Sequence, residues 1–224
     1  GGMGATFWEQ MAFKEEVGYW GIPGHGMGVS ATQWIGPSLM VFGNEAQKKK
    51  YLPDIAAGSA DDVWCTGYSE PDAGSDVLSV STRGEKTGDH YVVNGSKMFI
   101  SNGNIANFFV TLCLTNPEAE SRHQRHSVFV IDASSPGITR NKIRGKLGIR
   151  AHDTAEIFFD NVKVPAENLI GEVGNGFKCF MEFFNRSRSY VAAQGVGVAQ
   201  GALELAIKHV TKRRQFGSTL STFQ

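Results

Sequence analysis

The hydrophobic pattern of this chain changes its period twice, and this change constrains the fold more than any other feature. Residues 1–60 and 174–213 favour helix, and no proline interrupts the second of these segments. Residues 61–172 instead contain short β-type runs separated by Gly, Asn, Asp and Pro. Such segregation predicts an α+β fold in which helices flank an antiparallel β-barrel or sandwich.

Local signals divide the first helical segment. Apolar residues at helical spacing favour a helix over residues 7–17. A Gly-rich break at residues 21–28 follows, and Ser30 is a plausible N-cap for the next helix. Asn44 is the predicted N-cap of a third helix over residues 45–57.

The β-type runs of the middle segment are short and lie about ten to twenty residues apart. They are Val80 with Thr82, and residues 91–93, 108–111, 128–131 and 157–159. Asp89-His90 and Asn94-Gly95 are turn signals on either side of the run at 91–93. We therefore expect one short strand between two turns at this point.

The last helical segment carries an apolar stripe and several small residues. The stripe, spaced i, i+3, i+4 and i+7, consists of Phe177, Phe180, Met181 and Phe184. The small residues that leave room for another helix are Gly195, Gly197 and Gly201. Both features favour burial against a further helix, and we expect a homo-oligomer, either a dimer or a tetramer.

Composition excludes several classes of protein. The 224 residues include 22 basic and 22 acidic side chains, so no net charge attracts nucleic acid or an anionic membrane. No stretch is long and apolar enough to span a bilayer, and no signal-peptide pattern opens the chain. Its three cysteines are far apart, which indicates free thiols. We expect a cytoplasmic protein, or a mitochondrial matrix protein if the source is eukaryotic.

A metal site is not expected. His123 and His126 are three residues apart in a polar loop, but no third ligand lies nearby in the sequence. The segment GHGMG at residues 24–28 lacks the Lys-Ser/Thr pair of a phosphate-binding loop, and no Rossmann-type strand precedes it.

Two polar segments carry most of the functional information. Residues 68–76 read YSEPDAGSD and form a turn-like segment after a β-type run. Its hydroxyls and backbone N–H groups suit an acceptor-rich ligand. Residues 97–103 read KMFISNG and place the Phe99 ring two residues before the Ser101 hydroxyl, on one face of a regular strand. A flavin would satisfy both segments, although each alone is also compatible with a hairpin turn and a half-buried strand.

The two segments in this order resemble the acyl-CoA dehydrogenase family. The resemblance covers nearly the whole chain, and its further motifs are DNVKVP at 160–165, NLIG at 168–171, GNGF at 174–177 and RRQFG at 213–217. It implies a partial N-terminal helical domain at 1–60 and a middle β-domain at 61–172 that contacts flavin and acyl-CoA. Residues 173–224 are then the first long helix of a truncated C-terminal helical bundle.

The resemblance implies FAD as cofactor. In the family, the first segment binds the pyrimidine edge, here through the Ser69 hydroxyl and nearby backbone N–H groups. The aromatic ring, here Phe99 where many relatives have Trp, stacks on the isoalloxazine, and Ser101 hydrogen-bonds flavin N5. The implied cofactor-binding residues are Thr66, Tyr68, Ser69, Gly74, Ser75, Phe99, Ile100, Ser101, Arg213, Phe216 and Gln224.

The remaining implied contacts each have a structural alternative. Arg213 resembles the residue that binds the FAD pyrophosphate of a neighbouring subunit, or it offsets a helix dipole while Gly217 caps the helix. Phe216 resembles a position near the adenosine half. Ser75 and Arg188 resemble substrate-binding positions, or they are a turn hydroxyl and a solvated helix arginine.

No catalytic base is assigned within these residues. Family subunits are longer at both ends, and the base of most relatives is a Glu in the absent part of the bundle. A minority place it next to the arginine that matches Arg188, where this chain has Ser187. The acidic residues Glu70, Asp72 and Asp76 are interpreted as turn formers or helix-facing anions. We expect a core fragment, or a subunit that depends on a partner for its base, and an isolated 224-residue chain that is inactive.

The implied activity is α,β-dehydrogenation of an acyl-CoA to the 2,3-enoyl-CoA, with electrons passed to electron-transferring flavoprotein. Two alternatives remain open at this point. One is a flavin enzyme of the same fold that uses oxygen, an acyl-CoA oxidase or a monooxygenase. The other is a non-catalytic partner subunit that supplies structure and half of a flavin site.

Overall fold

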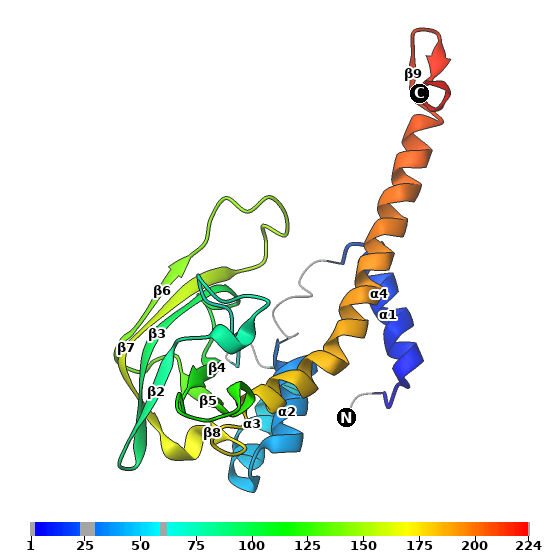
Figure 1. Ribbon diagram of the computed structural model, residues 1–224. Coiled ribbons are helices and arrows are strands. Elements are labelled where there is room, and N and C mark those ends of the chain that lie inside the picture. The colour runs from blue at the N-terminus through cyan, green and yellow to red at the C-terminus, as the bar shows by residue number, and fades with distance from the viewer. Residues whose placement is uncertain (1–2, 23–29, 59–61, 224) are drawn as a thin grey trace. The chain divides into compact units, whose positions relative to one another are not determined.

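The computed structural model describes residues 3–22, 30–58 and 62–223, which fall into two compact units (Figure 1). One unit contains the described residues up to Ile22 together with those from Asn185 onward. The other contains the described residues from Ser30 to Phe184. The boundary lies within the long helix α4, Gly176–Val210.

Of the two helix caps predicted at the start of the larger unit, only the second is confirmed. A π-helical segment, Ser30–Ile35, leads into α2, Gly36–Phe42, so Ser30 is the first residue of a helical segment and not the predicted N-cap. Most of the Gly-rich break before it lies outside the described residues. Helix α3, Glu45–Ala57, begins with the predicted cap: Asn44 Oδ1 accepts from Gln47 N at 2.8 Å, and Gln47 Oε1 accepts from Asn44 N at 3.1 Å.

The middle of the chain forms a mainly antiparallel sheet (Figure 1). Its strands are β1 Trp64–Gly67, β2 Arg83–Thr87, β3 His90–Ser101, β4 Phe108–Leu114, β5 His126–Asp132, β6 Ile138–Lys142, β7 Thr154–Pro165 and β8 Leu169–Ile170. Their order is β6-β7-β3-β2-β4-β5-β8, and β1 pairs with β4. The β1–β4 and β2–β4 pairings are parallel, and the other pairings are antiparallel. Short 3₁₀ turns occupy Val77–Ser79, Arg122–Gln124 and Ala166–Asn168.

The turn predicted at Asn94-Gly95 is wrong, because β3 runs through it. Its pairing with β7 shifts register between Val93 and Gly95, which marks a β-bulge. Gly95 has φ 144°, and a Cβ there would lie 2.6 Å from Thr82 Oγ1. The glycine therefore permits a bulge and a close approach rather than a chain reversal.

Alternate residues of the strands fill two separate cores. On β4, Val110 and Leu112 belong to a cluster shared with α2, α3 and the start of α4. Phe109 and Cys113 belong to a second cluster with β3, β5 and β7. Two rings of the predicted apolar stripe, Phe177 and Phe180, pack against the first cluster. They are therefore covered by the chain itself and need no second subunit.

Helix α1, Phe7–Tyr19, packs closely on α4 in the smaller unit. Tyr19 Oη donates to Glu204 at 2.6 Å, and a Cβ on Gly197 would lie 1.9 Å from the Glu15 carbonyl oxygen. A Cβ on Gly201 would lie 2.6 Å from the Tyr19 carbonyl oxygen. The predicted room for another helix is thus used by α1 at Gly197 and Gly201, whereas a Cβ on Gly195 would meet no described atom within 4 Å.

The smaller unit ends in a short hairpin of β9, Arg214–Gln215, and β10, Ser218–Thr219, followed by a 3₁₀ turn at Leu220–Thr222. Among the described residues, no helix combines the length and apolar character needed to cross a membrane.

Candidate functional site

The two polar segments contact each other in the larger unit. Met98 N donates to the Ser69 carbonyl oxygen at 2.9 Å, and Lys97 Nζ donates to the Tyr68 carbonyl oxygen at 3.2 Å. The turn that follows β1 is therefore held directly against β3. The two segments that the sequence pairs as a ligand site are therefore adjacent in the structure.

Several hydroxyls of this region have no hydrogen-bond partner in the part of the chain that the structure describes. They are Thr66, Ser69, Ser75 and Ser101. The neighbouring hydroxyls of Ser81 and Thr82 are instead committed to Glu70, at 2.8 and 2.6 Å. The hydroxyls that the family resemblance expects to bind cofactor or substrate are thus the ones without a protein partner. This fits a ligand that is rich in hydrogen-bond acceptors. The alternative for Ser75, a hydroxyl bonded within its own turn, is not observed.

Phe99 is not a core aromatic residue. Its side chain is 64 % exposed and its φ is 58°, in the left-handed region that disfavours residues with a Cβ. Strand β3 carries a second bulge between Lys97 and Ile100, which interrupts the simple alternation that the sequence analysis assumed. Ile100 is buried opposite Ala155, while Ser101 is half-buried opposite Thr154. A strained backbone that presents an exposed ring is characteristic of a functional site.

The turn itself is compact and anchored. Glu70 and Ala73 exchange two backbone hydrogen bonds, at 2.8 and 3.2 Å. Gly74 is exposed, and a Cβ built there would meet no atom within 4 Å. The Tyr68 ring packs edge-on against Phe180, with centroids 5.0 Å apart. Burial raises the pKa of the Tyr68 phenol, so this ring serves as an apolar support.

A buried ion pair lies beneath the turn. Lys97 Nζ donates to Glu70 Oε1 at 2.8 Å, and the two side chains are 0 % and 5 % exposed. Burial by itself would raise the pKa of Glu70. The Lys97 ammonium and hydrogen bonds from Thr82 and Ser81 outweigh this effect and lower the pKa of Glu70 to about 2. Burial also lowers the pKa of Lys97, against the pull of Glu70.

Two acidic residues of the turn, Glu70 and Asp76, are poorly suited to proton abstraction. Glu70 is a structural anion paired with Lys97 on β3 and does not face a helix dipole. Asp76 accepts a hydrogen bond from the Ser79 hydroxyl, which lowers its pKa. Lys97 was missed by sequence reasoning, because one lysine in a β-type run reads as a solvated residue. The only available signal was its position directly before Met98 and Phe99.

The other predicted residues belong to the smaller unit. Arg188 Nη2 donates to Asn185 Oδ1 at 2.9 Å on the exposed side of α4. Arg213 is exposed, and Phe216 is 96 % exposed with φ 48°. Gln224 lies outside the described residues. Gly217 does not cap α4, which ends at Val210, because it lies in the β9–β10 turn, where its carbonyl oxygen accepts from Arg214 Nη2 at 2.8 Å.

The two histidines considered as metal ligands, and the three cysteines, lie apart from one another in the structure. His126 is buried, with Nε2 3.0 Å from the Val80 carbonyl oxygen, and the His123 ring packs on Phe177. Cys65, Cys113 and Cys179 are free and buried. Within the residues that the structure describes, no three His, Cys, Asp or Glu side chains gather as metal ligands would.

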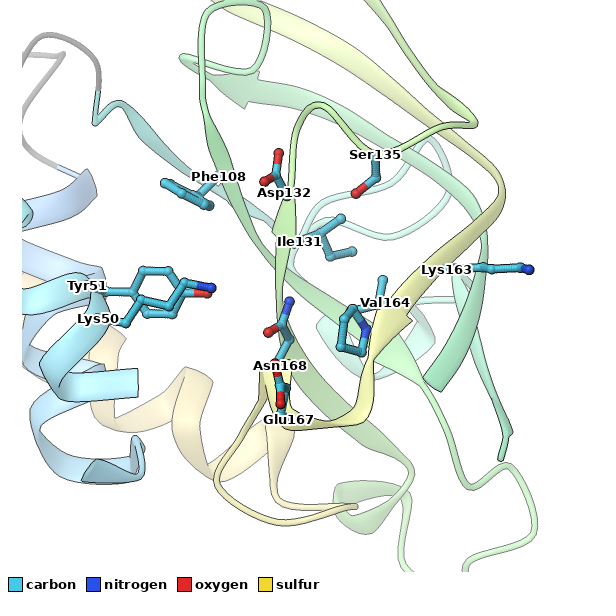
Figure 2. Close-up of a pocket in the computed structure, with 11 residues that line it drawn as sticks. Lys50, Tyr51, Phe108, Ile131, Asp132, Ser135, Lys163, Val164, Glu167 and Asn168 are labelled. Carbon is cyan, nitrogen blue, oxygen red and sulfur yellow. The ribbon is translucent and has the colours of Figure 1, made fainter. Parts of the chain in front are cut away.

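A separate pocket of about 310 Å³ lies in the larger unit (Figure 2). In Figure 2, Lys50 and Tyr51 on α3 lie on one side of β5, whereas the Ile131 side chain points to the other side. The pocket is lined by Lys50, Tyr51, Phe108, Ile131, Asp132, Ser135, Lys163, Val164, Pro165, Glu167 and Asn168. None of the residues predicted to bind flavin or substrate lines it, so it is distinct from the candidate site.

Family models cover nearly the whole chain. Residues 1–59 match the acyl-CoA dehydrogenase N-terminal domain, residues 65–162 the middle domain, and residues 174–224 the C-terminal domain. The chain thus has the arrangement of a known class of oxidoreductase: a β-domain that carries the turn of residues 68–76, called the donor turn below, with helices before and after it in the sequence. The chain belongs to the acyl-CoA dehydrogenase family.

Individual relatives agree with this assignment. The human very long-chain specific acyl-CoA dehydrogenase is 38% identical over 229 aligned residues, which cover 100% of this chain and 34% of that protein. The crystal structure of an acyl-CoA dehydrogenase from Geobacillus kaustophilus matches with TM-score 0.89 and 38% identity, over 100% of this chain and 58% of that one. A glutaryl-CoA dehydrogenase from Mycobacterium smegmatis in complex with FADH2 matches with TM-score 0.75 and 31% identity, over 87% and 48%. The chain therefore spans between about a third and three fifths of these relatives.

Proposed function

We propose that the protein is an FAD-dependent acyl-CoA dehydrogenase that converts an acyl-CoA into the 2,3-enoyl-CoA. The observation that carries this proposal is the hydrogen bond from Met98 N to the Ser69 carbonyl oxygen, because it joins the donor turn to the strand that bears Ser101. Two segments that resemble flavin-binding motifs are thereby part of one surface. The complex of a related glutaryl-CoA dehydrogenase with FADH2 supports the choice of cofactor.

The residues that would hold the flavin come from both segments. Ser69 would donate to its pyrimidine edge, Ser101 would donate at N5, and the exposed Phe99 ring would lie against its flat face. The bound flavin supplies a hydride acceptor for the β-hydrogen of the substrate. Ser69 then acts where negative charge accumulates on reduction, and a preorganised donor there favours the reduced form.

Proton removal from the α-carbon needs a base, and we assign none among the described residues. Glu70 is held as a buried anion by Lys97, Ser81 and Thr82. Ser187 is a buried hydroxyl on α4 and lacks a useful pKa for this task. A carboxylate from outside the described residues is therefore part of the proposal, as are the substrate roles of Ser75 and Arg188.

Electron-transferring flavoprotein is the proposed electron acceptor, and a homodimer or homotetramer is the proposed assembly. Support for the assembly comes from α4 in the smaller unit, where aliphatic side chains remain exposed to solvent. They include Val191, Val196, Val198, Leu203, Leu205 and Ile207, each at least half exposed. Such a surface is costly to leave in water, so a second copy of the chain is proposed to cover it. Arg213 and Phe216 would then contact the FAD of that neighbouring subunit.

The test is anaerobic addition of acyl-CoA thioesters of different chain length to the FAD-loaded full-length protein that supplies the proposed base, because the 224-residue chain alone is expected to be inactive. Bleaching of the flavin absorbance, with formation of the enoyl-CoA, is the expected result. Failure to bind FAD, or no bleaching with any acyl-CoA, would contradict the proposal. Rapid oxygen consumption with acyl-CoA would instead assign the protein to the oxygen-using enzymes of this fold, and FAD binding without reduction would favour a non-catalytic subunit.

A further inference from the structure

Lys97 is bonded in a way that requires a charged ammonium group. Its Nζ donates to Glu70 Oε1 at 2.8 Å, to the Leu112 carbonyl oxygen at 2.8 Å and to the Tyr68 carbonyl oxygen at 3.2 Å. Three acceptors need three N–H donors, which a lysine has only when it is protonated. The side chain is fully buried, so the charge acts in a low-dielectric environment where its field is poorly screened.

One of these three bonds polarises a peptide group of the candidate flavin turn. The Tyr68 carbonyl shares its peptide unit with the N–H of Ser69, one of the donors assigned to the pyrimidine edge. In a trans peptide the N–H points away from the carbonyl oxygen. An ammonium on the carbonyl side therefore draws electron density from the group and strengthens the N–H on the opposite side as a donor.

Glu70 sets the strength of this effect. It is ion-paired with the same ammonium and partly cancels its field. It is in turn held by Ser81 N at 2.8 Å and Thr82 N at 2.9 Å, both outside the candidate site. The pair is thus held by groups that lie outside the candidate site.

We propose that Lys97 is a positioning residue that tunes the flavin: by binding the Tyr68 carbonyl it strengthens the Ser69 N–H as a donor and raises the reduction potential of bound FAD, while Glu70 moderates this effect. The proposal rests on the proposed function, because it requires FAD at this turn. Lys97 itself touches neither substrate nor the reacting atoms in this scheme. It acts through the peptide group that it contacts.

The experiment compares reduction potentials of bound FAD, measured at pH 6 by equilibration with redox dyes. Lys97→Met removes the cation and should disfavour reduced flavin about tenfold, which is about 30 mV for a two-electron couple. Glu70→Gln keeps the shape but removes the opposing charge, so its potential should rise. Lys86→Met, at an exposed lysine on β2, is the control and should leave the potential unchanged.

The decisive result is a shift of the reduction potential in opposite directions in Lys97→Met and Glu70→Gln, because a merely structural role would not produce it. Unchanged potentials, or shifts of the same sign in both variants, would overturn the proposal. If Lys97→Met does not retain flavin, Lys97→Arg takes its place: it keeps the cation and should keep the wild-type potential, against the rise in Glu70→Gln. Failure of the proposed function would show separately, as absence of FAD binding or of acyl-CoA bleaching in the unaltered protein.

Discussion

Alanine substitutions at two glycines of α4, only two residues apart, should change stability in opposite directions. Replacing a helix-interior Gly by Ala favours folding by about 0.5–1 kcal/mol if nothing obstructs the new methyl group. Gly195 meets this condition, because a Cβ there would have no atom within 4 Å. We therefore expect Gly195→Ala to stabilise the protein by about 0.5–1 kcal/mol.

Gly197 differs because its position is occupied by α1. A Cβ there would lie 1.9 Å from the Glu15 carbonyl oxygen and 2.8 Å from Tyr19 N, whereas real Cβ contacts below 3.0 Å are essentially never seen. The obstructing atoms are backbone, so α1 as a whole must move away from α4. Overpacking of this kind costs about 1–3 kcal/mol, which outweighs the gain in helix propensity. The movement also strains the hydrogen bond between Tyr190 Oη and Gln10 Oε1, now 2.9 Å long.

The assay is urea unfolding followed by circular dichroism, with both variants and the unaltered protein under the same conditions. We expect the unfolding midpoint of Gly195→Ala to rise and that of Gly197→Ala to fall, with free energies of unfolding that differ by about 1–3 kcal/mol between the two variants. Equal shifts in the two variants, or a rise for Gly197→Ala, would refute the close contact between α1 and α4.

Three further outcomes follow from the larger unit. The carboxyl of Glu70 has a pKa of about 2 against an ordinary 4.5, so its ionised form adds about 3 kcal/mol to the free energy of unfolding above pH 4.5, and this is lost as the pH falls towards 2. Urea titrations at several pH values should show this loss in the unaltered protein and a smaller one in Glu70→Gln. The same dependence of stability on pH in both proteins would contradict the pairing. Ser101→Ala in the full-length protein should retain FAD but slow single-turnover reduction by acyl-CoA by about tenfold or more, since a donor at N5 is lost, and an unchanged rate would remove Ser101 from the site. Burial raises the pKa of the Cys113 thiol to about 12 and also raises that of Cys65, so a thiol reagent should modify them only as the protein unfolds, and rapid labelling of native protein would contradict their burial.

Local chemistry determined much of the fold before any long-range contact was known. Asn44 and Gln47 form a capping box, and the helix starts where the sequence predicts, because both partners lie within one turn. The β-type runs became strands for a similar reason, since alternating residues of β4 supply both cores. The motifs of residues 68–76 and 97–103 likewise identified the family and the candidate flavin turn.

Only the tertiary structure decided how these segments are held together. Asn94-Gly95 reads as a turn, but pairing with β7 on one side and contact with Thr82 on the other make it a bulge within one long strand. Lys97 reads as a solvated lysine, yet its three partners come from two sequence segments, residues 68–70 and Leu112. Phe99 and Gly197 depend in the same way on a strand irregularity and on a second helix. The sequence determines which residues can cap, pair or donate within a few positions, whereas burial, charge pairing and close approach depend on groups that only folding brings together.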